Sequence, residues 1–124
     1  MKGAARTYKT VSDKISSPRA TEADLLLDAA TRLQTVQHNW DSRSSGDLDQ
    51  ALRYNRVLWT IFISTVTKTD NPLPKPIRQN VANLGLFVLK HTISILAEPK
   101  PEKISALIDI NRNLAAGLAN HNAA

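Results

Sequence analysis

The sequence predicts a small all-α protein, a bundle of about four main helices with a short N-terminal arm. Apolar residues recur at helical spacing in four segments, and the breaks between these segments are rich in proline, glycine or serine. Only the β-branched stretch TIFISTV resembles a strand, and it lies inside one of the helical stripes. The 124 residues suffice for one hydrophobic core and not for two. We expect an arm over residues 1–17 and one bundle domain over residues 18–119.

The first helix is expected to start at Ser17-Pro18. A serine side chain accepts hydrogen bonds from the free N–H groups of a first turn, and proline fits the first helical position. Thr21 with Asp24 offers a second, later start. The segment DSRSSGD ends the stripe, which consists of Leu26, Ala29, Ala30, Leu33, Val36 and Trp40.

A second helix is predicted after this break, with Asp47 and Gln50 as its capping box. The segment TKTDNPLPKP follows it and contains three prolines within five residues. Proline lacks the backbone donor and clashes with the preceding turn, so we expect a stiff, extended connector here. The stripe of this helix is Leu48, Ala51, Leu52, Asn55, Leu58, Trp59, Phe62 and Val66.

The third and fourth helices are each introduced by a proline, Pro76 and Pro101. Gly85 weakens the third helix by about 1 kcal/mol relative to alanine and indicates a close approach by another element. Gly117 and the tail ANHNAA close the chain. The third stripe is Ile77, Val81, Leu84, Val88, His91 and Ile95, and the fourth is Ile104, Leu107, Ile108, Asn111, Leu114 and Leu118.

Two asparagines, Asn55 and Asn111, stand on apolar stripes. A buried amide without partners costs about 1–3 kcal/mol, so one hypothesis is that the two bond across the bundle and fix helix register. The alternative, given equal weight, places one or both at the stripe edge in water. Their neighbours Arg56 and Asp109 are suited to an ion pair between helices, worth under about 1 kcal/mol at a surface.

No constellation of catalytic or metal-binding residues is found in the sequence. The absence of cysteine excludes disulfides, thiolate metal sites and a cysteine nucleophile. No two of the three histidines, His38, His91 and His121, share a helix at metal-ligand spacing, and His91 is expected to be a satisfied core residue. The four glycines are too dispersed for a phosphate loop. We therefore expect no catalytic residue, cofactor or metal, and no enzyme.

The net charge of +5 is spread over single Lys and Arg residues. A dispersed positive surface favours ordinary solvation over a nucleic-acid footprint. The N-terminus has no apolar stretch behind its basic residues, and no uninterrupted apolar run approaches the roughly 20 residues that span a bilayer. We expect a cytoplasmic protein without membrane insertion.

Four segments, in matching order and separation, resemble the FlaF family of alphaproteobacterial flagellar proteins. They are SPR at 17–19, NRVLW at 55–59, LPKP at 73–76 and LIDINRNLAAGL at 107–118. The resemblance implies a role in flagellum assembly, as a chaperone that binds flagellin before export and as a regulator of flagellin synthesis. It implies flagellin as a partner and action opposite the translation repressor FlbT.

The motif positions and the aromatic residues give the candidate site. Trp59 and Phe62 are expected in the core, although part of this apolar surface is a candidate groove for a partner helix. Arg56 and Arg112 are favoured for partner contact. Alternatives are an RNA-binding regulator of flagellin message, for which no stacking surface is found, and an adaptor acting with FlbT. The partner-binding candidates are Arg56, Trp59, Phe62, Leu73, Phe87 and Arg112, and the structural motif residues are Asn55, Asp109 and Asn111.

Overall fold

The computed structural model describes residues 19–123 of the chain. This part of the chain forms four α-helices and one short 3-10 helix, which confirms the predicted all-α bundle. The expected arm at 1–17 and the helix start at Ser17-Pro18 lie outside the described residues. In chain order the elements are α2 (Arg19–His38), η1 (Trp40–Ser42), α3 (Asp47–Val66), α4 (Lys75–Ala97) and α5 (Pro101–Ala123).

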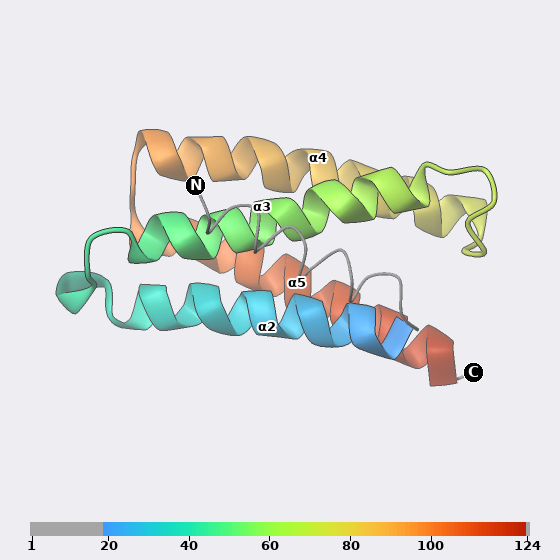
Figure 1. Ribbon diagram of the computed structural model, residues 1–124, viewed down its shortest axis with the longest axis horizontal. Helices are drawn as coiled ribbons and strands as arrows, with labels where there is room; N and C mark the ends of the chain where they lie inside the picture. Colours follow the sequence, from blue (N-terminus) through green and yellow to red (C-terminus); the bar gives the residue numbers. More distant parts are fainter. Residues whose placement is uncertain (1–18, 124) are drawn as a thin grey trace.

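The four helices run up and down, and each lies beside the next in sequence (Figure 1). The most extensive helix contact joins α2 to α5, the first and last of the four. Helix α4 packs mainly against α3 and only slightly against α5. Helices α3 and α5 therefore face each other across the diagonal of the bundle, and α4 is its peripheral member.

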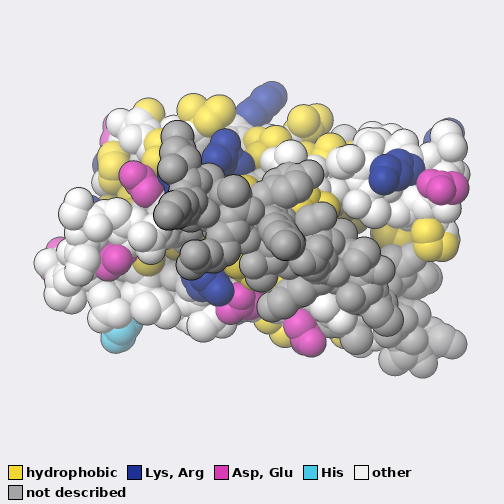
Figure 2. Space-filling view, viewed as in Figure 1, with side chains coloured by type: hydrophobic (Ala, Val, Ile, Leu, Met, Phe, Trp, Pro, Cys, Tyr) yellow, Lys and Arg dark blue, Asp and Glu magenta, His cyan; other side chains and the backbone are white. Residues whose placement is uncertain are grey.

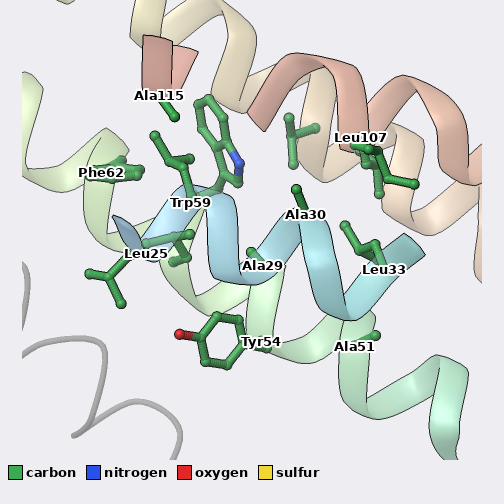
Figure 3. Close-up of a cluster of buried hydrophobic side chains, with 14 of the residues drawn as sticks. Leu25, Ala29, Ala30, Leu33, Ala51, Tyr54, Trp59, Phe62, Leu107 and Ala115 are labelled. Atoms are coloured by element: carbon green, nitrogen blue, oxygen red, sulfur yellow. The ribbon is translucent and has the colours of Figure 1, made fainter. Parts of the chain in front are cut away.

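The core lies where α2, α3 and α5 meet. Ala29 and Ala30 of α2 are fully buried, and such small side chains allow the backbones of neighbouring helices to approach closely. In Figure 3, Ala30 and Leu33 lie on the side of α2 that faces Leu107 of α5. Trp59 of α3 is also completely buried in this cluster.

The start of α3 differs from the predicted capping box. Gly46 occupies the N-cap with φ of 91°, a left-handed conformation that glycine adopts without strain. Asp47 is consequently the first helical residue, and its carboxylate accepts a hydrogen bond at 2.8 Å from the Ser44 N–H. The predicted box of Asp47 with Gln50 is wrong because the glycine turn places the aspartate one position too late to cap.

Two other helix ends also differ from the prediction. Helix α2 ends at His38, so Trp40 leaves the helical stripe and lies half-buried in η1, with the Arg43 guanidinium 3.7 Å above its ring. Helix α5 continues through Gly117 to Ala123. A single helical glycine costs only about 1 kcal/mol, and no proline follows to stop the helix.

The proline-rich connector before α4 is fixed by hydrogen bonds to one side chain. Arg78 donates from Nε to the Leu73 carbonyl and from Nη1 to the Lys68 carbonyl, both at 3.1 Å. Leu73 itself is buried, and its N–H donates to the Asn71 side chain at 2.9 Å. The first turn of α4 contains Pro76, as predicted.

Candidate partner-binding surface

Helices α3 and α4 approach each other closely at Gly85. A Cβ atom added there would overlap the Ile63 side chain and contact the Trp59 ring at 3.4 Å. The predicted close approach at this glycine is therefore confirmed. The contact buries only a narrow face of α4, consisting of Val81, Gly85, Val88, Thr92 and Ile95.

A second apolar stripe on α4, next to its buried face, is left largely exposed. We call it the α4 apolar face and define it as Leu86, Leu89, Ile93 and Leu96. Ile93 is 67% exposed, Leu86 54% and Leu96 50%, while Leu89 is half-buried. Of the five large hydrophobic residues exposed in the described part of the chain, four belong to α4. Figure 2 shows hydrophobic side chains gathered along the edge of the molecule formed by α4.

A groove of about 570 Å³ runs between this face and α3. We call it the α3–α4 groove. Its α4 wall is formed by Leu89, Ile93 and Leu96, its α3 wall by Asp49, Arg53, Arg56 and Thr60, and Leu52 and Thr92 also line it. One wall is thus apolar and the other is polar with two cations.

The guanidinium groups of the two groove arginines have no partner among residues 19–123. No hydrogen bond or ion pair in this part of the chain involves the side chain of Arg53 or Arg56, and the Thr60 hydroxyl reaches only the Arg56 backbone carbonyl. The predicted ion pair between Arg56 and Asp109 is therefore wrong. The side chains of Arg56 and Asp109 are both exposed to solvent, and their helices face each other across the bundle diagonal. The two charged groups therefore point away from each other.

A buried polar triad joins α3 to α5 across that diagonal. The Trp59 Nε1–H donates to Asn111 Oδ1 at 2.9 Å, and Asn111 Nδ2 donates to Asn55 Oδ1 at 2.7 Å. Both asparagines are 0% exposed, which confirms the hydrogen bond across the bundle and excludes the solvent-edge alternative. Asn55 Nδ2 is buried without a partner among the described residues. The triad favours the observed register of α3 against α5, because a shift of either helix would break both hydrogen bonds and leave the buried indole and the Asn111 amide without partners.

The predicted site residues do not form one surface. Trp59, Phe62 and Leu73 are at most 5% exposed, so a partner cannot reach them in this conformation. The Trp59 and Phe62 rings pack edge to face at 5.9 Å. Their burial confirms the core role expected for the two aromatics.

The remaining candidates are accessible but lie on different sides of the bundle. Arg56 lines the α3–α4 groove. Phe87 is 46% exposed and stacks on His91 at 5.3 Å, and it lies on the other side of α4 from the α4 apolar face. Arg112 is exposed on α5, where its Nη2 donates at 2.6 Å to Gln34 of α2. Only Arg56 therefore belongs to a groove with an apolar wall.

Helix α4 is also the described helix that meets the length and composition of a membrane span. Its most apolar window of 18 residues has a mean hydropathy of 1.3, and 28% of that window is buried. Core helices of globular proteins meet the same criterion. The low burial shows that the apolar content of α4 exceeds what its contacts with α3 and α5 cover.

The titratable groups form no reactive cluster in the described part of the chain. No three His, Asp or Glu side chains within residues 19–123 are placed to bind one metal ion. The His91 Nε2 lies 2.7 Å from the Lys103 carbonyl, so this ring is satisfied as expected, but it is half-buried and lies outside the core. Burial raises the pKa of Tyr54 from 10.0 to about 12, with the nearby Asp28 carboxylate adding to the rise.

The α4 apolar face and Arg53 were absent from the predicted site. The signal was available, because residues 86, 89, 93 and 96 recur at helical spacing. They lie beside the stripe that was assigned to the core, so α4 has an apolar arc too wide for one neighbour. The sequence alone did not show which part of that arc is buried.

Comparison with known proteins identifies a family but no individual relative. The family model described as flagellar protein FlaF matches residues 4–118. No curated protein and no solved structure matches the chain.

Proposed function

We propose, since the chain belongs to the FlaF family of flagellar proteins, that its flagellar role is to bind flagellin as a secretion chaperone and to regulate flagellin synthesis. The observation that supports this proposal is the α4 apolar face beside the unpaired arginines of α3. Exposed apolar patches rimmed by polar residues are typical of protein-binding sites.

The physical need for such a chaperone follows from the partner. Terminal segments of flagellin become amphipathic helices only when they pack in the filament, and before assembly their apolar faces are prone to aggregate. A helical protein with an uncovered apolar wall can receive such a segment by the helix-in-groove mode. The net charge of +5 favours an acidic partner, mainly by raising the association rate.

In this role the chain binds its partner and performs no reaction. It works in the cytoplasm, before flagellin is exported, and acts opposite the repressor FlbT in setting flagellin synthesis. Binding of the flagellin chain would link the two activities, because the amount of unoccupied chaperone reports how much flagellin awaits export.

The test is co-purification of the full chain with flagellin and with an unrelated RNA, each at two salt concentrations. We expect a stoichiometric complex with flagellin that persists at moderate salt, because apolar burial contributes most of the binding free energy. RNA binding through phosphates would instead weaken steeply with salt. Retention of RNA and not of flagellin would overturn the proposal in favour of an RNA-binding regulator.

A further inference from the structure

We propose that the α3–α4 groove is the docking site for one amphipathic helix with an apolar stripe flanked by acidic residues. The apolar stripe packs on Leu89, Ile93 and Leu96, and the carboxylates pair with Arg53 and Arg56. The inference rests on the proposed function only in naming flagellin as the source of that helix. The chemistry of the helix follows from the groove itself.

The dimensions of the groove fit about two to three turns of helix. On α3 the lining positions 49, 53, 56 and 60 follow helical spacing, and on α4 the positions 89, 93 and 96 do the same. At 1.5 Å per residue the α3 wall from Asp49 to Thr60 is roughly 16 Å long. The α4 wall from Leu89 to Leu96 is shorter, roughly 10 Å, so the two walls face each other over about two turns. A third helix laid between them would cover Ile93, the most exposed apolar residue of the face.

The charge of the groove selects an acidic occupant. Arg53 and Arg56 are three residues apart and have no partner within residues 19–123, so carboxylates at i and i+3 or i+4 of a docked helix can reach both. Asp49 lies at the end of the groove near the C-terminus of α4. Because that end is acidic, it disfavours a carboxylate and gives the occupant a preferred direction.

Two other occupants fit less well. A second copy of the chain packed here about a two-fold axis would bring the Arg53 and Arg56 of both copies into one interface, and like charges repel. A lipid surface requires a convex or flat apolar face with a wide basic rim. The groove is concave, and its rim has an acid at one end.

The experiment uses two synthetic helical peptides with the same apolar stripe, one flanked by glutamates and one by lysines, together with purified flagellin. Binding to the full chain is measured by fluorescence anisotropy. The variants are Ile93→Glu, which inserts a charge in the apolar wall, and the double variant Arg53→Glu with Arg56→Glu. The controls are Leu27→Glu, which changes an apolar residue 44% exposed on α2, and Lys90→Glu, an exposed charge reversal on α4 outside the groove.

We expect the glutamate peptide to bind the wild type and both controls equally. Its affinity should fall at least about tenfold in Ile93→Glu and in the double arginine variant, the size of effect typical of an interface anchor. The lysine peptide should bind only the double variant, because there the charges are complementary. Circular dichroism of every variant verifies that the bundle remains folded.

The outcomes separate the groove from the proposed function. Equal binding of the glutamate peptide by all variants, or no binding by any, overturns the groove assignment. Equal affinity of flagellin for the wild type and for Ile93→Glu also overturns the groove assignment, while the proposed chaperone function stands. A peptide that docks in the groove while flagellin does not bind leaves the groove assignment in place and removes the proposed function. If the wild type binds neither peptide but forms a dimer that Ile93→Glu abolishes, the assignment is overturned in favour of a second copy. If the wild type binds neither peptide but binds anionic phosphatidylglycerol vesicles and Ile93→Glu does not, it is overturned in favour of a membrane.

Discussion

Helices α2 and α4 use apolar residues in opposite ways. Helix α2 contacts both α5 and α3 and buries seven apolar side chains, while Leu27 is its only large exposed one. Helix α4 is the more apolar of the two, yet Leu86, Ile93 and Leu96 remain at least half exposed. The helix with the greater apolar content is therefore the less buried.

The difference shows that burial depends on the number of neighbours as well as on the apolar content of a helix. Helix α2 lies between two partners, and its alanines let both approach. Helix α4 has one main partner, so only one side of its wide apolar arc is covered. An apolar face that remains after the bundle has closed is available for another polypeptide. The predictions below test this contrast from the largest expected effect to the smallest.

The same leucine-to-alanine change should have unequal effects on the two helices. Leu33→Ala in α2 removes a fully buried side chain and should lower the free energy of unfolding by about 2–5 kcal/mol. Leu86→Ala in α4 removes a side chain that is 54% exposed and should change it by no more than about 0.5 kcal/mol. Urea unfolding followed by circular dichroism measures both, and comparable losses would show that the α4 apolar face is part of the core.

Replacing a buried polar side chain should also cost more stability in the triad than on α4. Asn111→Leu leaves the Trp59 indole and the Asn55 amide without their partners, at about 1–3 kcal/mol for each unsatisfied group. Thr92→Val in α4 should cost about 1 kcal/mol or less, because the Thr92 hydroxyl bonds only the Val88 carbonyl of its own helix.

Asn55→Leu separates the two asparagines in the same unfolding measurement. It strands only the Asn111 Nδ2 and removes an amide nitrogen that already lacks a partner, so its loss should be smaller than that of Asn111→Leu. Equal losses would show that the indole hydrogen bond contributes nothing to the triad.

The two helical glycines should respond with opposite signs. Gly85→Val forces methyl groups into Ile63 and Trp59 at the α3–α4 contact and should destabilise the fold by about 1–3 kcal/mol. Gly117→Ala meets no atom within 4 Å on α5 and should stabilise the helix by about 0.5–1 kcal/mol. Thermal unfolding of both variants gives the comparison, and a stabilising Gly85→Val would mean that α4 does not pack closely on α3.

The smallest effect at pH 7 concerns the contact between α2 and α3 at Tyr54. Burial and the Asp28 carboxylate raise the pKa of Tyr54 to about 12, so the folded state keeps this proton where the unfolded state, with its pKa of 10.0, loses it. The resulting stability is complete below pH 10 and is lost as the pH rises to about 12. Tyr54→Phe should remove the fall in the free energy of unfolding between pH 10 and about 12. It should leave the stability at pH 7 nearly unchanged, because the hydroxyl has no hydrogen-bond partner within residues 19–123.

Tyrosinate absorbance in a Tyr8→Phe background reports the Tyr54 titration directly. A midpoint near pH 10 would show that water reaches the α2–α3 contact, and α2 would then be less enclosed than the structure shows.

Local chemistry allowed several features to be predicted. Prolines at positions 76 and 101 place the starts of two helices, and apolar spacing identifies most of the core. The close approach at Gly85 also follows from residue type and position, whereas residue type left burial and solvent exposure of Asn55 and Asn111 equally weighted. The capping box at Asp47 failed because a glycine turn, Gly46, displaced it by one residue.

The candidate site was predicted only in part. Arg56 was named and lies in the groove, but the aromatic candidates Trp59 and Phe62 are enclosed in the core. The α4 apolar face was missed, because its leucines and isoleucine have the same hydrophobicity as the core residues beside them.

The sequence by itself determined the helices, their approximate ends and their apolar arcs, because these depend on residue type and on spacing within about ten positions. It also gave the family resemblance, which depends on the order and separation of four short segments along the chain. Only the tertiary structure decided which part of each arc is covered and which asparagine and tryptophan groups meet across the diagonal. These features depend on contacts between helices some fifty residues apart, such as the bond between residues 59 and 111. Periodicity identifies the apolar side of a helix but gives no information about which neighbour packs on it, and on α4 that missing information is the location of the open groove.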